Sequence, residues 1–390
     1  MSNIMNTYGR LPVSFTKGEG AWLWDENGNK YLDALSGIAV CGLGHAHPTV
    51  AKAISEQAST LIHTSNLYGI PLQEELATKL CSLSDMDKVF FSNSGAEANE
   101  AAIKIARLYG HQKQIELPTI LVAHKSFHGR TLTTLSATGN PKVQEGFSPL
   151  VPGFIHVNYN HIDELSEQLK SNSNIVAIML EPVQGEGGIN IPDNNFLTEI
   201  RELCNQFDLL MILDEIQTGI CRTGKWFAHQ HESISPDIMT LAKGLGNGVP
   251  IGACLAKGKA AEIFTPGTHG STYGGNPLVC SAALATIDVL EHKNLAQRAA
   301  QLGHFFLTEF TNKLQNQSLV KNIRVKGLMI GIELNKPCTE LVKRALEQKL
   351  LINVTANQVI RLLPPLIISD DEAQQIVDII CQLIQNFEPS

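Results

Sequence analysis

An acid and an amine occupy the two positions of this sequence best placed for chemistry. Asp214 follows five apolar residues, Leu209 to Leu213, which are typical of a strand buried in a sheet. Lys243 follows a second apolar run, Ile238 to Leu241, and lies between an alanine and a glycine. Ligands of open α/β sheets gather at the carboxyl ends of strands, and a buried acid there needs a cationic partner. A lysine in apolar surroundings is a candidate amine nucleophile, although a solvated surface lysine is the commoner case.

Two further segments contain residue types that suit a phosphorylated aromatic ligand. Phe91 to Glu97 (FSNSGAE) runs from a strand pattern directly into a helix, and the free amides at a helix start suit a phosphate. An ordinary N-cap serine at Ser94 explains this segment equally well on its own. In Phe127-His-Gly-Arg130 the ring could stack on a flat ligand, and the guanidinium could hold a carboxylate. A phosphate site, a buried acid and an amine nucleophile together indicate pyridoxal phosphate.

Three other patterns point to different ligands and are weaker. Gly219 to Lys225 fits G-x-x-x-x-G-K, but Trp226 stands where a nucleotide-binding loop needs Ser or Thr. Gly244 to Val249 lacks the third glycine of a dinucleotide-binding fingerprint. His45-Ala-His47 contains metal-binding residue types, but a proline and a helical pattern follow, which favours a loop leading into a helix. We therefore expect neither an ATP site nor a metal centre.

Composition narrows the class of protein. The chain has 390 residues, 43% of them hydrophobic, and a formal net charge of −8, so it has ample material for a large core. Because no basic run occurs, we expect neither nucleic acid nor a membrane surface as a partner. Apolar runs are too short to cross a bilayer, and the first ten residues lack a signal-peptide pattern. The eight cysteines include no C-x-x-C pair, which favours reduced thiols in a cytoplasmic protein.

The middle of the chain alternates between strand and helix patterns. Strand patterns cover residues 88–93, 119–123, 154–157, 175–180 and 209–213, and helix patterns cover residues 95–110, 162–170 and 196–207. These strands are continuously apolar, which is typical of a parallel sheet buried on both faces. The sequence therefore predicts an α/β fold with a mainly parallel central sheet flanked by helices.

The two ends of the chain show different patterns. Strand-like halves flank Glu26-Asn27-Gly28-Asn29, which predicts a hairpin. After about Leu290 we expect two helical stretches, a strand over 328–334, a helix over 340–349, a strand over 351–354 and a last helix that Ser369 caps. We expect a large α/β domain over residues 61–289 and a smaller α+β domain formed by residues 1–60 and 290–390.

Taken together, the motifs resemble those of the class III pyridoxal-phosphate aminotransferases. The segments above occur in order with Glu181 to Gly188 (EPVQGEGG), Asp214-Glu-Ile-Gln217 and Gly270 to Pro277 (GSTYGGNP), and the likeness begins at about Tyr8. The resemblance implies a fold-type I structure and transfer of the terminal amino group of N-acetylornithine to 2-oxoglutarate. Succinylornithine, ornithine and succinyldiaminopimelate are alternative donors, and an aminomutase is a further alternative.

The resemblance also implies which residues bind the cofactor. Lys243 resembles the lysine that holds the cofactor as a Schiff base, Asp214 the partner of the ring nitrogen, and Gln217 the partner of the phenolic oxygen. The remaining cofactor-binding residues implied are Ser94, Gly95, Ala96, Phe127 and Thr272. Thr272 resembles a threonine that reaches the phosphate from the other subunit, which implies a homodimer with shared sites.

Four more residues resemble substrate contacts of the family. Arg130 and Ser271 are similar to the contacts of the acylated donor. Arg361 resembles the arginine that binds a carboxylate of 2-oxoglutarate. Glu186 resembles the acid that masks this arginine while the donor is bound.

Overall fold

The computed structural model describes residues 3–388, and its largest element is a seven-stranded sheet. In spatial order its strands are β4 (Lys88–Ser92), β10 (Gly252–Ala256), β9 (Ile238–Leu241), β8 (Leu210–Asp214), β7 (Ile175–Leu180), β5 (Thr119–Ala123) and β6 (Phe154–Val157). β10 runs antiparallel to its two neighbours, β4 and β9, and all other neighbouring strands of this sheet are parallel. The predicted α/β fold with a mainly parallel sheet is confirmed.

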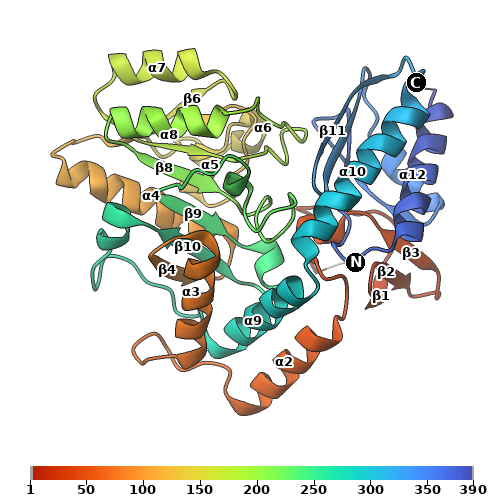
Figure 1. Cartoon of the computed structure of the whole chain (residues 1–390), viewed down its shortest axis with the longest axis horizontal. Helices are drawn as coiled ribbons and strands as arrows, with labels where there is room; N and C mark the ends of the chain where they lie inside the picture. The colour runs from red at the N-terminus through yellow and green to blue at the C-terminus, as the bar shows by residue number, and fades with distance from the viewer. Residues whose placement is uncertain (1–2, 389–390) are drawn as a thin grey trace.

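Helices bury both faces of this sheet. Every residue of β5, β7, β8, β9 and β10 is buried. Along β5, Ile120 and Val122 join one apolar cluster with helix α4, whereas Leu121 and Ala123 join another with α7 and α8. This alternation follows from the two-residue repeat of a strand. The helices of this half are α3 (Pro71–Ser84), α4 (Gly95–Gln112), α5 (Leu132–Ala137), α6 (Pro141–Gln144), α7 (Ile162–Ser171), α8 (Phe196–Gln206) and α9 (Pro277–His292) (Figure 1).

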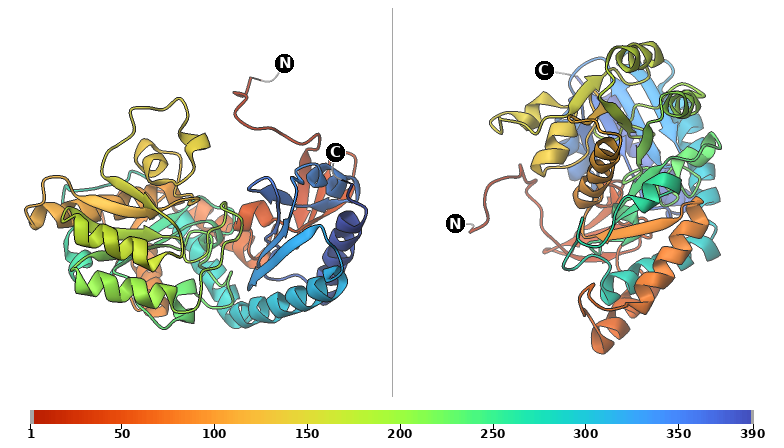
Figure 2. Two further views of the ribbon diagram at one scale, coloured as in Figure 1. Left: turned by 90° about the horizontal axis from the view of Figure 1, so that it is seen from above. Right: turned by 90° about the vertical axis from the view of Figure 1, so that its left-hand side faces the viewer.

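The two ends of the chain meet in the other half of the molecule. One antiparallel sheet contains β11 (Val320–Lys326), β12 (Met329–Leu334), β15 (Val359–Leu362) and β14 (Asn353–Thr355). A second sheet contains β1 (Phe15–Glu19), β2 (Trp22–Asp25), β3 (Lys30–Asp33) and β13 (Leu350–Leu351), and it pairs the N-terminal hairpin with the C-terminal region. Figure 2 shows these N-terminal strands beside the C-terminal elements.

Three helices complete this half: α10 (Leu295–Leu314), α11 (Leu341–Glu347) and α12 (Asp370–Gln385). Helix α10 packs on β11 and on α12, and α12 also contacts α11. From the N-terminal region, α2 (Pro48–Thr60) packs against α9. The short helices are α1 (Ser36–Ala39), η1 (Ala228–His231), η2 (Lys243–Leu245) and η3 (Gly258–Glu262). We propose the domain division predicted above; residues 1–2 and 389–390 of its smaller part lie outside the described residues.

Several predicted elements need correction. Asp214 is the last residue of β8 and not the first residue after it. After α9 a single helix, α10, leads into β11, which the sequence did not reveal because Lys, Asn and Arg interrupt its apolar residues. The predicted strand over 351–354 is divided between β13 and β14, which belong to different sheets. The capping box that Ser369 and Glu372 form at the start of α12 is confirmed. Within the described residues, no helix is long and apolar enough to cross a membrane.

Candidate active site

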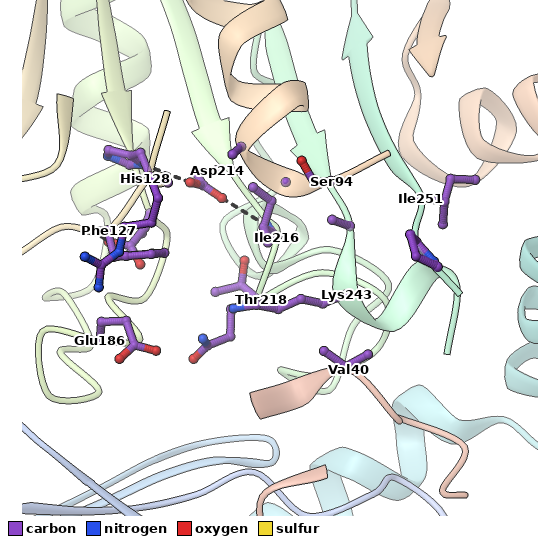
Figure 3. Close-up of a pocket in the computed structure, with 18 of the residues that line it drawn as sticks. Val40, Ser94, Phe127, His128, Glu186, Asp214, Ile216, Thr218, Lys243 and Ile251 are labelled. Atoms are coloured by element: carbon purple, nitrogen blue, oxygen red, sulfur yellow. Dashed lines mark hydrogen bonds and ion pairs between the residues drawn. The ribbon is translucent and has the colours of Figure 1, made fainter. Parts of the chain in front are cut away.

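A cavity of about 380 Å³ opens where β5, β7, β8 and β9 end (Figure 3). The sheet supplies its walls through the residues that follow these strands, and α4 contributes its first turn. Val40, from the N-terminal part of the chain, lines the opposite side. Of the predicted site residues, the cavity brings together Ser94, Gly95, Ala96, Phe127, Arg130, Glu186, Asp214, Gln217 and Lys243.

Asp214 is the acid at the inner end of the cavity, and it is 4% exposed. Its Oδ2 accepts hydrogen bonds from His128 Nδ1 at 2.7 Å and from Asn99 Nδ2 at 2.8 Å, and its Oδ1 accepts one from the Ile216 amide at 3.1 Å (Figure 3). Burial opposes protonation of His128, but the hydrogen bond to Asp214 and the charges of Asp214 and Glu181 together outweigh it and raise the pKa of His128. The result is a buried His128–Asp214 pair that fixes the orientation of Asp214.

Lys243 reaches the same cavity from the end of β9 (Figure 3). Its φ of 41° lies in the left-handed region, which is strained for a residue with a side chain. In the tight turn that follows, a Cβ on Gly246 would lie 2.1 Å from the Val249 carbonyl oxygen, so only glycine fits there. Burial lowers the pKa of the Lys243 ammonium. The charge of Glu186 opposes this lowering, and the charge of Arg361 adds to it. Among the described residues, Nζ has no hydrogen-bond partner, so the amine is free to react.

The first turn of α4 offers hydrogen-bond donors to the cavity. Ser94 is the N-cap, and its Oγ accepts from the Glu97 amide at 3.2 Å. The amides of Gly95 and Ala96 have no partner among the residues that the structure describes. A Cβ on Gly95 would lie 2.7 Å from Ile216, so glycine allows α4 to approach the loop after β8. The start of this helix can therefore hold an anion such as a phosphate.

Gln217 and Phe127 complete this part of the wall. Gln217 is buried, and its Oε1 has no hydrogen-bond partner, which leaves an acceptor for a ligand hydroxyl. The Phe127 amide donates to Glu181 Oε2 at 3.1 Å, which holds the aromatic ring at the cavity. The Arg130 guanidinium lies 5.5 Å from the centroid of this ring and is exposed.

An ion pair joins the cavity to the smaller half of the molecule. Arg361 on β15 is fully buried, and its Nη1 donates to Glu186 Oε1 at 2.6 Å. Its Nε donates to Asn353 Oδ1 at 3.0 Å, and its buried Nη2 has no partner. Glu186 lines the cavity and its side chain is 37% exposed, whereas Arg361 lies behind it.

Two predicted residues lie outside this cavity. Ser271 Oγ accepts from the Gly274 amide at 3.0 Å and from Asn93 Nδ2 at 3.3 Å, and Asn93 lines the cavity. Thr272 is exposed in the loop before α9. Its contact with a site of another subunit stays a prediction.

Sequence reasoning missed three buried polar residues of the site. His128 lies in the Phe127 to Arg130 motif and Asn99 in the predicted helix over 95–110, but nothing in the sequence signals that both bond Asp214. Glu181 follows β7 and accepts from the Phe127 amide at 3.1 Å and from the Gly185 amide at 3.2 Å. Burial raises the pKa of the Glu181 carboxyl to about 7; the charge of His128 opposes this rise and that of Asp214 adds to it.

Comparison with known proteins shows which family has this fold and this set of residues. The family described as Aminotransferase class-III matches residues 4–384. The chain is 58% identical to the acetylornithine aminotransferase of Nitrosomonas europaea, over 99% of this chain and 98% of the relative. Among solved structures, the ornithine aminotransferase of Toxoplasma gondii superposes with a TM-score of 0.95 at 36% identity, covering 98% of this chain and 92% of that one. The acetylornithine aminotransferase of Elizabethkingia anophelis superposes with a TM-score of 0.87 at 38% identity, covering 98% and 96%.

The fold and the site are those of a fold-type I enzyme that depends on pyridoxal 5'-phosphate. Within that class, the chain belongs to the class-III aminotransferases. The residues at the cavity fit this cofactor. Unpartnered amides at the start of α4 suit a phosphate, and an unpartnered acceptor on Gln217 suits a phenolic hydroxyl. Asp214 suits a ring nitrogen, and the Lys243 amine suits an aldehyde.

Proposed function

We propose that this enzyme transfers the terminal amino group of N2-acetyl-L-ornithine to 2-oxoglutarate, giving N-acetyl-L-glutamate 5-semialdehyde and L-glutamate. Such a reaction belongs to arginine biosynthesis, and we propose that it takes place in the cytoplasm. The acetylornithine aminotransferases of Nitrosomonas europaea and Methanothermobacter thermautotrophicus, at 58% and 49% identity, support this donor. The observation that carries the proposal is the Arg361–Glu186 pair at the edge of a cavity that also contains Arg130.

We propose the following roles for the residues of the cavity. Bound pyridoxal phosphate supplies an aldehyde that accepts an amino group and a cationic ring that withdraws electrons. Asp214, held by His128 and Asn99, keeps a negative charge where that ring requires one. Lys243 Nζ would hold the cofactor and would then move a proton. Burial lowers the pKa of this amine, which favours the neutral form that can accept a proton. Gly95 and Ala96 would hold the phosphate, Phe127 would stack on the ring, and Gln217 would bind its hydroxyl.

A second requirement is that one cavity accept two differently shaped substrates. The donor carries its carboxylate far from the reacting carbon, whereas 2-oxoglutarate has one carboxylate next to it. In our proposal the exposed Arg130 binds the carboxylate of the donor while Glu186 neutralises Arg361. When 2-oxoglutarate enters, Glu186 turns away and Arg361, whose Nη2 is unpartnered, binds the carboxylate in a bidentate manner.

A panel of amine donors tests this proposal. Purified enzyme with 2-oxoglutarate should have its highest kcat/KM with N-acetylornithine, compared with succinylornithine, ornithine and succinyldiaminopimelate. Activity with 4-aminobutyrate but not with any acylated ornithine would contradict the proposed donor. Turnover of a donor without 2-oxoglutarate would point instead to an aminomutase.

Replacing Arg130 by alanine should mainly weaken donor binding. Loss of a charge-assisted contact should raise KM for the donor roughly tenfold to a hundredfold, with a smaller change in kcat and in KM for 2-oxoglutarate. Steady-state kinetics with each substrate varied in turn measures both effects. Arg344→Ala is the matched control, since Arg344 pairs with Glu340 on the surface of α11. Unchanged donor kinetics would show that another residue binds the donor carboxylate.

The raised pKa of Glu181 predicts a pH dependence of stability. The folded protein keeps this proton up to a pH of about 7, whereas the unfolded chain releases it near the ordinary value of 4.5. The folded state therefore binds more protons in this window, and the contribution of Glu181 to stability falls as pH rises through it. Relative to Glu181→Gln, the free energy of unfolding of the wild type should fall by roughly 1–3 kcal/mol between about pH 5 and about pH 8.

Urea denaturation of the cofactor-free protein at both pH values measures this difference. Glu347→Gln, a change of an exposed glutamate on α11, is the control and should show no such trend. A difference between wild type and Glu181→Gln that stays constant across the window would contradict the prediction.

We further propose that the enzyme acts as a homodimer with shared sites. Large apolar side chains are exposed on the two segments that meet here: Tyr273, at 61%, follows Thr272, and Leu67 and Tyr68, at 86% and 69%, follow Asn66. Asn66 Nδ2 donates to the Ser271 carbonyl at 3.0 Å, which joins the two segments. Clustered exposed apolar residues favour burial against another protein surface. Light scattering should give twice the 42.5 kDa of one chain, and a monomer that is fully active would contradict the proposal.

A further inference from the structure

The loop that contains Glu186 has an unfavourable backbone conformation. We call residues 184–190, whose two ends pair through Gln184 and Asn190, the Glu186 loop. Ile189 in this loop has a φ of 52°, in the left-handed region that a β-branched residue rarely adopts. Such a conformation persists only where the surrounding structure holds it. The contacts that hold the loop therefore decide where the Glu186 side chain lies.

The antiparallel sheet of β11, β12, β15 and β14 provides these contacts. Arg324, Gly331 and Arg361 occupy one row across three of its strands, so both arginine side chains stand on the same face, one on each side of the glycine. Ile189 is fully buried, and a Cβ on Gly331 would lie 2.9 Å from the Ile189 Cβ. Because Gly331 has no side chain, the Glu186 loop can pack closely on the sheet between the two arginines.

Arg324 bonds the backbone of this loop, whereas Arg361 pairs with its acid. Arg324 Nε donates to the Ile189 carbonyl at 2.9 Å, and Nη2 donates to the Gly188 carbonyl at 2.7 Å. The remaining group, Nη1, pairs with Glu333 Oε2, and the Arg324 side chain is 16% exposed. Arg324 does not line the cavity, so it has no contact with a substrate there. Its effect on the reaction must pass through the loop.

We propose that Arg324 is a positioning residue that holds the Glu186 loop on this sheet, so that Glu186 masks Arg361 while the amine donor reacts. Thr355 on β14 adds to this hold, because its Oγ1 donates to the Glu186 carbonyl. With the backbone fixed, only the Glu186 side chain has to turn when 2-oxoglutarate enters. Without Arg324 the strained loop would relax, and Arg361 would be open to a carboxylate at every stage. This inference rests on the proposed roles of Glu186 and Arg361.

Single-turnover reactions of the holoenzyme with two amine donors test this role. N-acetylornithine reacts while Arg361 is masked, whereas L-glutamate, whose amino group is next to a carboxylate, needs Arg361 free. In Arg324→Met the ratio of kmax/Kd for N-acetylornithine to kmax/Kd for L-glutamate should fall roughly tenfold, the effect of losing a charge-assisted hydrogen bond. A purely structural loss would lower both values together. A ratio equal to that of the wild type would overturn the proposal.

Two further variants complete this experiment. Arg298→Met is the matched control, since Arg298 on α10 also bonds a carbonyl, that of Ile368, and a carboxylate, that of Asp370. It should leave the ratio within about twofold. If Arg324→Met does not fold, Arg324→Lys keeps the charge but cannot bond both carbonyls and Glu333 at once. It should still lower the ratio about threefold, and no change would overturn the proposal.

A double-mutant cycle tests whether Arg324 acts through Glu186. In a Glu186→Gln background, Arg324→Met should change the ratio by less than about twofold, and a full tenfold effect would contradict the proposal. Hydrogen exchange of the holoenzyme gives a readout without turnover. Amides of residues 184–190 should exchange at least about tenfold faster in Arg324→Met, and equal rates would overturn the proposal. If the wild type does not react with N-acetylornithine, the proposed donor is wrong, and the exchange rates still decide the role of Arg324.

Discussion

Replacing Lys243 by alanine is expected to reduce kcat by about 10⁵-fold or more, the size of loss seen when a residue that both holds and activates the reacting group is removed. The reason is geometric, since Lys243 is the lysine of the cavity and its amine has no protein partner in the part of the chain that the structure describes. No other residue that lines the cavity has an amine in its side chain. Single-turnover measurements with the donor would show whether the chemical step itself has been lost.

The matched control for this change is Lys88→Ala. Lys88 lies on an exposed part of β4 and pairs with Glu262, so its loss should leave kcat within about twofold. The visible absorption band of the purified enzyme should change in Lys243→Ala and stay the same in the control. Retention of normal turnover by Lys243→Ala would refute the role of this residue.

The second large effect is expected for Asp214→Asn, which should lower kcat by roughly 10³- to 10⁴-fold. A neutral amide cannot hold a positive charge on the ring, and it also removes the carboxylate that bonds the buried His128. The change should therefore weaken cofactor retention in addition to slowing turnover. Kinetics at saturating cofactor separates the two losses, and dialysis followed by absorbance measures the retention.

Asp378→Asn is the control for this substitution, because Asp378 pairs with Lys313 at the surface of α12. It should keep both activity and cofactor. If Asp214→Asn retained activity within about tenfold, the ring nitrogen would not depend on this acid, and the proposed electron sink would be wrong.

The sequence predicts most strands of the central sheet because each of these strands is a continuous run of apolar residues. Continuously apolar runs such as Ile175–Leu180 occur only where both faces are buried. Among the strands that were not predicted, β10 and β11 lack this signal. In β10 (Gly252–Ala256) most residues are small, and in β11 (Val320–Lys326) polar residues interrupt the apolar ones. Both strands form because they pair with neighbouring strands, and these pairings depend on residues far away in the sequence, which local patterns do not reveal.

In the site, too, local motifs could be predicted from the sequence, whereas contacts between distant residues could not. Motifs quoted from the sequence contain most of the cavity residues, because turns after parallel strands share one edge of the sheet. Pairings between distant residues could not be predicted. His128 meets Asp214 across 86 positions, and Arg361 meets Glu186 across 175.

Trapping the cofactor with borohydride tests the central claim most directly. Reduction of the holoenzyme followed by proteolysis and mass spectrometry should place the added mass of the cofactor on the peptide that contains Lys243, and on no other lysine. Excess amine donor, added before reduction, should remove that label. A stable label on a different lysine would contradict the account of how this cavity works.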